Sequence, residues 1–241
     1  MTLATVQTLY QVVEATWPSA AKTQVGPWTI RRGEGGGSRV SAATAHAPFA
    51  DVDIPLAEAA MTALGQDRIF MIRDGDDALD QALAARGYEV KDPVNLYAAP
   101  LARVTAPNAP HHMTFRAWPP LAIQTELWSE AHIGPARIAV MARADCPKTT
   151  LFARHGQTPA GNVYVGTHDR IAMFHALDVA PDHRRHGVAQ ALILSAVRWA
   201  AEVGADQMAL VVTQANAGAN RLYASMGFTL VGQYHYRIAK G

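Results

Sequence analysis

The chain has 241 residues, of which 49% are hydrophobic and 17% are charged. This composition is typical of a globular protein with a substantial core, built as one large domain or two smaller ones. The 21 basic and 20 acidic side chains nearly cancel and are scattered along the chain, so the charge pattern argues against nucleic acid or a membrane as partner.

The single cysteine, Cys146, excludes an internal disulfide and a cysteine-rich metal site. No apolar run approaches the ~18 residues that a membrane-spanning helix needs. The N-terminal segment lacks a basic start and carries Glu14 inside its apolar stretch, which is unlike a signal peptide. These features favour a cytoplasmic protein.

The first half, residues 1–105, predicts a smaller α/β domain. Residues 28–32 and 39–43 are expected to form a hairpin across the glycine-rich run 33–37, because a strand-like segment follows that run where a phosphate loop would lead into a helix. Periodicity then predicts a helix, a strand, a helix and a strand over residues 55–64, 68–73, 77–86 and 89–98.

A proline-containing segment, residues 104–110, predicts the boundary to a second domain over residues 106–241. Its expected strands are residues 113–118, 149–154, 162–167, 171–179, 208–213 and 228–238. Its expected helices are residues 121–130, 137–143, 188–203 and 217–226. The third of these helices ends at Gly204, and the strand that follows it is almost wholly apolar, as in a strand that is buried on both faces.

An internal repeat links the two halves at an offset of 140 residues, since 227 − 87 = 140. At that offset Gly87-Tyr88 aligns with Gly227-Phe228, together with the strand and the helix that precede each pair. The first half is therefore interpreted as a degenerate copy of the second, although strand–helix–glycine–strand is also common in α/β proteins.

The junction between the predicted strand 171–179 and the helix that follows it favours an anion site. Glycine at position 187 allows a close approach to the backbone, and a new helix begins there with its positive dipole end. Arg184 and Arg185 add positive charge. The junction is expected to hold a pyrophosphate.

Three motifs stand in a fixed order in the second half: Leu177-Asp178-Val179-Ala180-Pro181, Arg184-Arg185-His186-Gly187-Val188-Ala189, and Asn216-(x)5-Leu222-Tyr223-(x)3-Gly227-Phe228. Together they resemble the GNAT superfamily of N-acetyltransferases over about residues 113–238. The resemblance implies an acyl-CoA N-acyltransferase fold, which has a mixed, splayed central sheet with flanking helices. With the repeat, it implies a tandem arrangement whose N-terminal copy is degenerate.

The resemblance also implies residue roles for acetyl-CoA as co-substrate. The backbone of Leu177, Asp178 and Val179 would bind the pantetheine arm, as an added strand would. The pyrophosphate would lie on the loop formed by Arg184, Arg185, His186, Gly187, Val188 and Ala189. Asn216 would bond the cofactor arm, and Tyr223 would protonate the departing thiolate. The implied reaction is direct attack by an amine on the acetyl group, without a metal.

The sequence departs from the family pattern at the general base. Many family members carry a glutamate on a central strand, and the corresponding strands here have none. His175 is the one ionisable group in the middle of its strand and could serve as the base. It could equally be a core or substrate-lining histidine, and the amine could arrive neutral or lose its proton through water. His183 and His186 are expected to be solvated loop residues, and His111-His112 is not expected to bind a metal.

The sequence thus predicts an acetyltransferase that acts on a primary amine, with a small-molecule acceptor favoured over a protein. Two alternatives remain open: a non-catalytic acyl-CoA-binding sensor or structural module, and an acyltransferase that uses longer chains. The first half places Asp76 and Leu83 where the second half has Asn216 and Tyr223. It is therefore expected to be catalytically silent, and to cover the acceptor side or provide a homodimer face.

Overall fold

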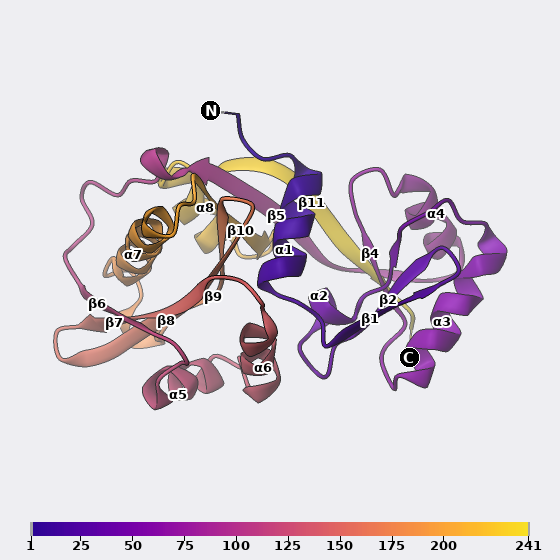
Figure 1. The fold of residues 1–241 in the computed structure, drawn as a ribbon, viewed down its shortest axis with the longest axis horizontal. Coiled ribbons are helices and arrows are strands. Elements are labelled where there is room, and N and C mark those ends of the chain that lie inside the picture. The colour runs from indigo at the N-terminus through magenta and orange to yellow at the C-terminus, as the bar shows by residue number, and fades with distance from the viewer. Residues whose placement is uncertain (1, 241) are drawn as a thin grey trace. The chain divides into compact units, whose positions relative to one another are not determined.

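A computed structural model describes residues 2–240, and Figure 1 shows their helices and strands. The helices are α1 Val6–Thr16, α2 Ser38–Ser41, α3 Ile54–Ala63, α4 Asp77–Ala85, α5 Ala122–Glu130, α6 Pro135–Arg143, α7 Val188–Glu202 and α8 Ala217–Ser225, with short 3-10 turns η1 Asp51–Asp53, η2 Leu101–Arg103 and η3 Pro181–His183. The strands are β1 Ala21–Val25, β2 Trp28–Arg32, β3 Thr44–Ala45, β4 Ile69–Ile72, β5 Glu89–Pro100, β6 Met113–Ala117, β7 Lys148–His155, β8 Thr158–His168, β9 Ile171–Val179, β10 Gln207–Thr213 and β11 Thr229–Ile238. In this part of the chain, no helix is both long enough and apolar enough to span a membrane.

The chain forms two compact units. The first unit holds Met1–Pro18, Leu96–Val211 and Ala217–Val231, and the second holds Ser19–Asn95, Val212–Asn216 and Gly232–Gly241. Helix α1 thus groups with the C-terminal half, although the sequence suggested one division at residues 105 and 106. Its buried residues Leu9, Val12 and Val13 explain this grouping, because the helix packs its apolar face on β8 and β9.

The sheet of the first unit has the strand order β11-β5-β10-β9-β8-β7-β6. Strands β6 to β9 form an antiparallel meander, and β9 and β10 are parallel because α7 carries the chain between them. Helix α7 packs on β7, β8 and β9 through a buried stripe that includes Leu192, Ala196 and Trp199. The predicted helices and strands of this half are confirmed to within a few residues.

The parallel pairing of β9 and β10 stops halfway along the strands. Residues 171–174 of β9 pair with residues 207–210 of β10, and the described chain shows no ladder pairs between them further on. On the other edge of β9 the register with β8 shifts between Asn162 and Tyr164, and Ala176 has φ +52°. The indole Nε1 of Trp128 donates to the Ala176 carbonyl at 2.8 Å. This bulge turns β9 away from β10, so the predicted splayed sheet is confirmed.

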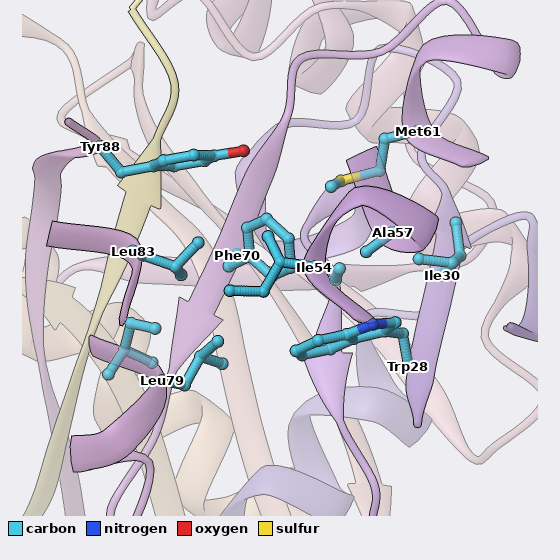
Figure 2. Close-up of a cluster of buried hydrophobic side chains, with 11 residues drawn as sticks. Trp28, Ile30, Ile54, Ala57, Met61, Phe70, Leu79, Leu83 and Tyr88 are labelled. Atoms are coloured by element: carbon cyan, nitrogen blue, oxygen red, sulfur yellow. The ribbon is translucent and has the colours of Figure 1, made fainter. Parts of the chain in front are cut away.

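The second unit has its own apolar core, shown in Figure 2. Phe70 on β4 is fully buried, and its ring meets those of Trp28 and Tyr88 edge to face at 5.5 and 5.8 Å between centroids. The Trp28 Nε1 donates to the Asp53 carbonyl at 2.8 Å, which satisfies its polar atom. The strand β4 pairs antiparallel with β11, and β1-β2-β3 form a separate small sheet.

The predicted hairpin across residues 33–37 is wrong. Residues 38–41 form the one-turn helix α2, which buries Val40, and β2 instead pairs antiparallel with β1. A two-residue turn joins β1 and β2 because Gly26, with φ +56°, precedes Pro27. The glycine run therefore connects a strand to a short helix.

The predicted repeat matches the observed element boundaries. Helices α4 and α8 begin at 77 and 217 and end at 85 and 225, and β5 and β11 begin at 89 and 229, so each difference is 140. Gly87 and Gly227, which end the helices, both have positive φ, of +80° and +93°. The two halves thus share one strand–helix–strand plan.

Candidate active site

The junction between β9 and α7 is a loop with two left-handed residues. Arg185 has φ +67°, and Gly187 has φ +79° and is the N-cap residue of α7. In the described chain, the backbone amides of residues 185–190 donate to no protein acceptor. Successive free amides at the N-terminus of a long helix form an anion-binding surface, because the helix dipole adds to them.

This loop lines a cavity of about 560 Å³ together with α8. That volume lies within the range of about 300–1,000 Å³ that small-molecule and cofactor sites occupy. Of the residues predicted to bind the cofactor, those that line the cavity are Val179, Arg184, Arg185, Gly187, Val188 and Ala189. Helix α8 contributes Gly218, Arg221, Leu222 and Ser225. The cavity therefore combines free amides with three guanidinium groups, a donor set that suits phosphate.

Gly187 is needed for a reason that the sequence did not reveal. A Cβ built on Gly187 would lie 2.6 Å from Pro110 Cδ, so the residue is held both by its positive φ and by close packing of another segment. The absence of a Cβ thus makes room for Pro110, and the anion surface is formed by the amides of the loop.

We expect Gly187→Ala to lower the free energy of unfolding by about 1–3 kcal/mol, because alanine is strained at this φ and meets Pro110. Gly204→Ala is the matched control, since Gly204 has φ +84° and nothing within 4 Å of a built Cβ. Urea unfolding of both variants measures the difference. A cost at Gly187 no larger than that at Gly204 would show that the Pro110 contact contributes nothing.

At the end of β9, the backbone groups on the side of β10 form no ladder pairs with that strand in the described chain. Val179 still pairs with Gly161 of β8, and Asp178 with Asn162, so the opposite edge is the one available to a ligand. The Arg184 Nε donates to the Val179 carbonyl at 3.0 Å and holds the loop against this strand. Burial raises the pKa of Asp178, although the charge of Arg184 partly offsets this. Leu177 and Asp178 do not line the cavity.

Tyr223 lies on α8 with its ring buried among other aromatic rings. Its ring centroid is 6.3 Å from that of Tyr97, 5.7 Å from Phe174 and 6.0 Å from Phe228. Its hydroxyl makes no hydrogen bond within the described chain. The hydroxyl oxygen is not fully buried and keeps some contact with solvent. Burial raises the pKa of Tyr223 well above its usual value, so the hydroxyl stays protonated near neutral pH.

His175 is a buried residue of β9 with a defined partner. Its Nε2 is 2.8 Å from the Thr16 hydroxyl, which itself donates to the Val12 carbonyl at 2.7 Å. The one hydroxyl proton is thereby used, so the Nε2 of His175 must be the donor of its bond to Thr16. The imidazole also packs against Trp17 and Tyr164, at 5.0 and 6.0 Å between centroids.

Tyr223 and His175 do not line the cavity, and neither do the predicted residues Asn216 and His186. Asn216 is exposed in the turn between β10 and α8, where its backbone N–H donates to the Thr213 carbonyl at 3.1 Å. His186 is exposed in the loop, and its carbonyl oxygen is 2.5 Å from His112 Nε2. His186 is nevertheless not isolated, because its ring lies 4.8 Å from that of His155. Sequence spacing gave no signal for that contact.

Comparisons with known proteins agree with this geometry. Residues 112–228 match the acetyltransferase (GNAT) family. The uncharacterized N-acetyltransferase YobR of Bacillus subtilis (strain 168) is 27% identical over 248 residues, which cover 98% of this chain and 99% of that protein.

Two solved structures share the fold. A GCN5-related N-acetyltransferase from Kribbella flavida has a TM-score of 0.75 at 17% identity, covering 100% of this chain and 97% of that one. A tandem GNAT protein from the clavulanic acid biosynthesis pathway has a TM-score of 0.61 at 16% identity, covering 82% of this chain and 74% of that one. The chain therefore carries an acetyltransferase domain of the GNAT family over residues 112–228.

Proposed function

We propose that the chain transfers the acetyl group of acetyl-CoA to a primary amine of a small molecule. The observation that carries this proposal is the cavity at the start of α7, where free loop amides, arginine side chains and the bare end of β9 adjoin the helix that bears Tyr223. A phosphate-bearing cofactor with an extended arm fits such a donor set.

The residues present fit the binding of CoA. The amides of residues 185–190 and the guanidinium groups of Arg184, Arg185 and Arg221 would bind the diphosphate. The unpaired edge of β9 at residues 177–179 would bond the amide groups of the arm, as a neighbouring strand would. Asn216 keeps its proposed contact with the arm only if its side chain turns toward the cavity, which it does not line.

Acetyl-CoA supplies an acetyl thioester when it is bound. Tyr223 Oη would hold the proton that the thiolate requires, because the raised pKa keeps the hydroxyl protonated and no protein acceptor in the described chain competes for that proton. A backbone amide on the splayed part of β9 would donate to the acetyl oxygen and stabilise negative charge there.

His175 could act as the general base only if its Nδ1 atom accepted the proton. Nε2 already carries a proton that is donated to Thr16, so a proton from the amine would have to be accepted by Nδ1. This arrangement favours the alternative in which His175 is an oriented core histidine. The amine would then arrive neutral or lose its proton through water.

The second unit is proposed to be catalytically silent. At the place of Tyr223 the repeat has Leu83, which is fully buried in the core of Figure 2. At the place of Asn216 it has Asp76, whose carboxylate accepts from the backbone amide of Arg73 at 2.9 Å. The first half of the chain thus has a core residue and a turn residue where the C-terminal half has Tyr223 and Asn216.

The decisive experiment is a panel of amines assayed for CoA thiol release from acetyl-CoA. We expect turnover with at least one small primary amine and none without an amine. Binding of CoA without turnover on any amine, peptide N-termini included, would favour a sensor or structural module. Faster turnover with longer acyl-CoA donors would identify the chain as a different acyltransferase.

A further inference from the structure

Four histidines from three segments meet beside the phosphate loop, and we call them the histidine cluster: His112, His155, His183 and His186. The Nδ1 atoms of His155 and His183 are 3.1 Å apart, within hydrogen-bond distance. The ring of His155 also lies 5.2 Å from that of His112 and 4.8 Å from that of His186, between centroids. His183 lines the cavity, so the cluster adjoins the proposed phosphate site.

The hydrogen bonds fix where protons can be added. A bond between two Nδ1 atoms needs one proton, which one ring donates and the other accepts. The His155–His183 pair can therefore gain one proton on an outer Nε2 and keep its bond, as an imidazolium donating to an imidazole. A second added proton would leave both rings charged at close range. His112 already donates from Nε2 to the carbonyl of His186, which can only accept.

Desolvation and the neighbouring histidines disfavour protonation of His155 when no anion is present. The titratable and charged groups on the neighbouring segments are His111, Arg154, Asp178, Asp182, Arg184, Arg185 and Arg221, of which four are arginines. Desolvation, together with His186, His112 and His183, holds the pKa of His155 below its usual value. A phosphate in the cavity would reverse this balance, because its negative charge favours the protonated ring.

We propose that the histidine cluster is a proton-coupled contact for the phosphate groups of the cofactor, which takes up about one proton when phosphate binds and so adds a positive charge to the site. The inference rests on the proposed function and deepens it, because a backbone amide cannot gain a proton in this pH range whereas an imidazole ring can. Within residues 2–240 no three His, Cys, Asp or Glu side chains are arranged to share a metal ion, which favours a proton as the charge that the cluster gains.

Isothermal titration calorimetry of CoA into the full chain tests this directly. Titrations at about pH 6, 7 and 8, in two buffers of different ionisation enthalpy and with a chelator, give the number of protons taken up. We expect uptake that approaches about one proton per CoA and a Kd that falls by up to about tenfold per unit of decreasing pH. Dephospho-CoA provides the second arm, because it lacks the phosphate monoester that itself titrates near pH ~6.

Uptake with both ligands identifies the diphosphate as the contact. Uptake with CoA alone that is lost in His183→Gln identifies the 3′-phosphate. His155→Gln and His183→Gln should each abolish most of the uptake, whereas His168→Gln should keep it, because His168 is a partly buried histidine that pairs with Asp169 outside the cluster.

Tight CoA binding without uptake, or uptake that survives both cluster substitutions, overturns this inference and leaves the acetyltransferase proposal intact. Failure of CoA to bind at every pH overturns both. The wild-type titration needs no variant, so a folding defect in a substituted chain cannot hide the answer.

Discussion

Tyr223→Phe is expected to lower kcat for acetyl transfer by about 100-fold or more, while the Kd for CoA changes by less than about twofold. The substitution removes only a hydroxyl that has no protein partner in the described chain, and it keeps the ring among Tyr97, Phe174 and Phe228. The fold should therefore be unaffected. Steady-state release of CoA thiol and calorimetric CoA binding separate the two effects.

Tyr97→Phe is the matched control for this experiment. Its hydroxyl is 3.1 Å from Asn220 Oδ1, so its removal should cost about 0.5–1.5 kcal/mol of stability with little change in turnover. The raised pKa of Tyr223 predicts a second feature, namely that the acid form persists at pH values where an exposed tyrosine would have ionised. Equal turnover in wild type and Tyr223→Phe would remove this residue from the acid role.

Local patterns were sufficient for most of the fold of the C-terminal half. The apolar periodicity of α7, the nearly continuous apolar run of β10 and the positive-φ glycines at the helix ends are all encoded over a few residues. Helix α1 carried the same kind of signal, since Val6, Leu9, Val12 and Val13 share a face and Thr5 accepts from the Thr8 amide. Its grouping with the first unit depends on packing against strands more than 140 residues further along, which no local pattern encodes.

The missed features of the site all join residues that are distant in sequence. Thr16 meets His175 across 159 positions, and His112 meets His186 across 74. The close packing of Pro110 against Gly187 likewise arises only in the tertiary structure. Motif spacing identified which segment forms the anion loop, but it could not show which side chains surround that loop or which ring nitrogen of His175 carries a proton.

The hairpin error has a related cause. Residues 39–43 contain Val40 and two alanines, so their composition alone does not separate a strand from a single helical turn. In the structure Ser41 donates to the Gly37 carbonyl at 3.1 Å, and Val40 is 1% exposed, which stabilises the turn. The better hairpin signal was the Gly26-Pro27 pair upstream, whose glycine takes the positive φ that a two-residue turn requires.

A like charge in the proposed phosphate site should abolish cofactor binding without unfolding the chain. Ala189 lines the cavity in the first turn of α7, so Ala189→Glu would place a carboxylate where the diphosphate is proposed to bind. We expect the Kd for CoA to rise by about 100-fold or more, a loss of ~2.7 kcal/mol. The helix itself should gain about 0.3–1 kcal/mol, because an acidic side chain near a helix N-terminus interacts favourably with the dipole.

These opposite signs make Ala189→Glu more informative than a substitution of Gly187, which would strain the loop whether or not phosphate binds there. Thermal melts with and without CoA measure both effects in one experiment. Wild type with CoA at ~100 times its Kd should gain ~2.7 kcal/mol, whereas the variant should show an unchanged or higher melting temperature alone and no shift with ligand. Ala191→Glu, on the same turn but outside the cavity lining, should keep the shift. If Ala189→Glu keeps the full shift, the diphosphate binds elsewhere, because a buried carboxylate and a phosphate cannot share one set of amides.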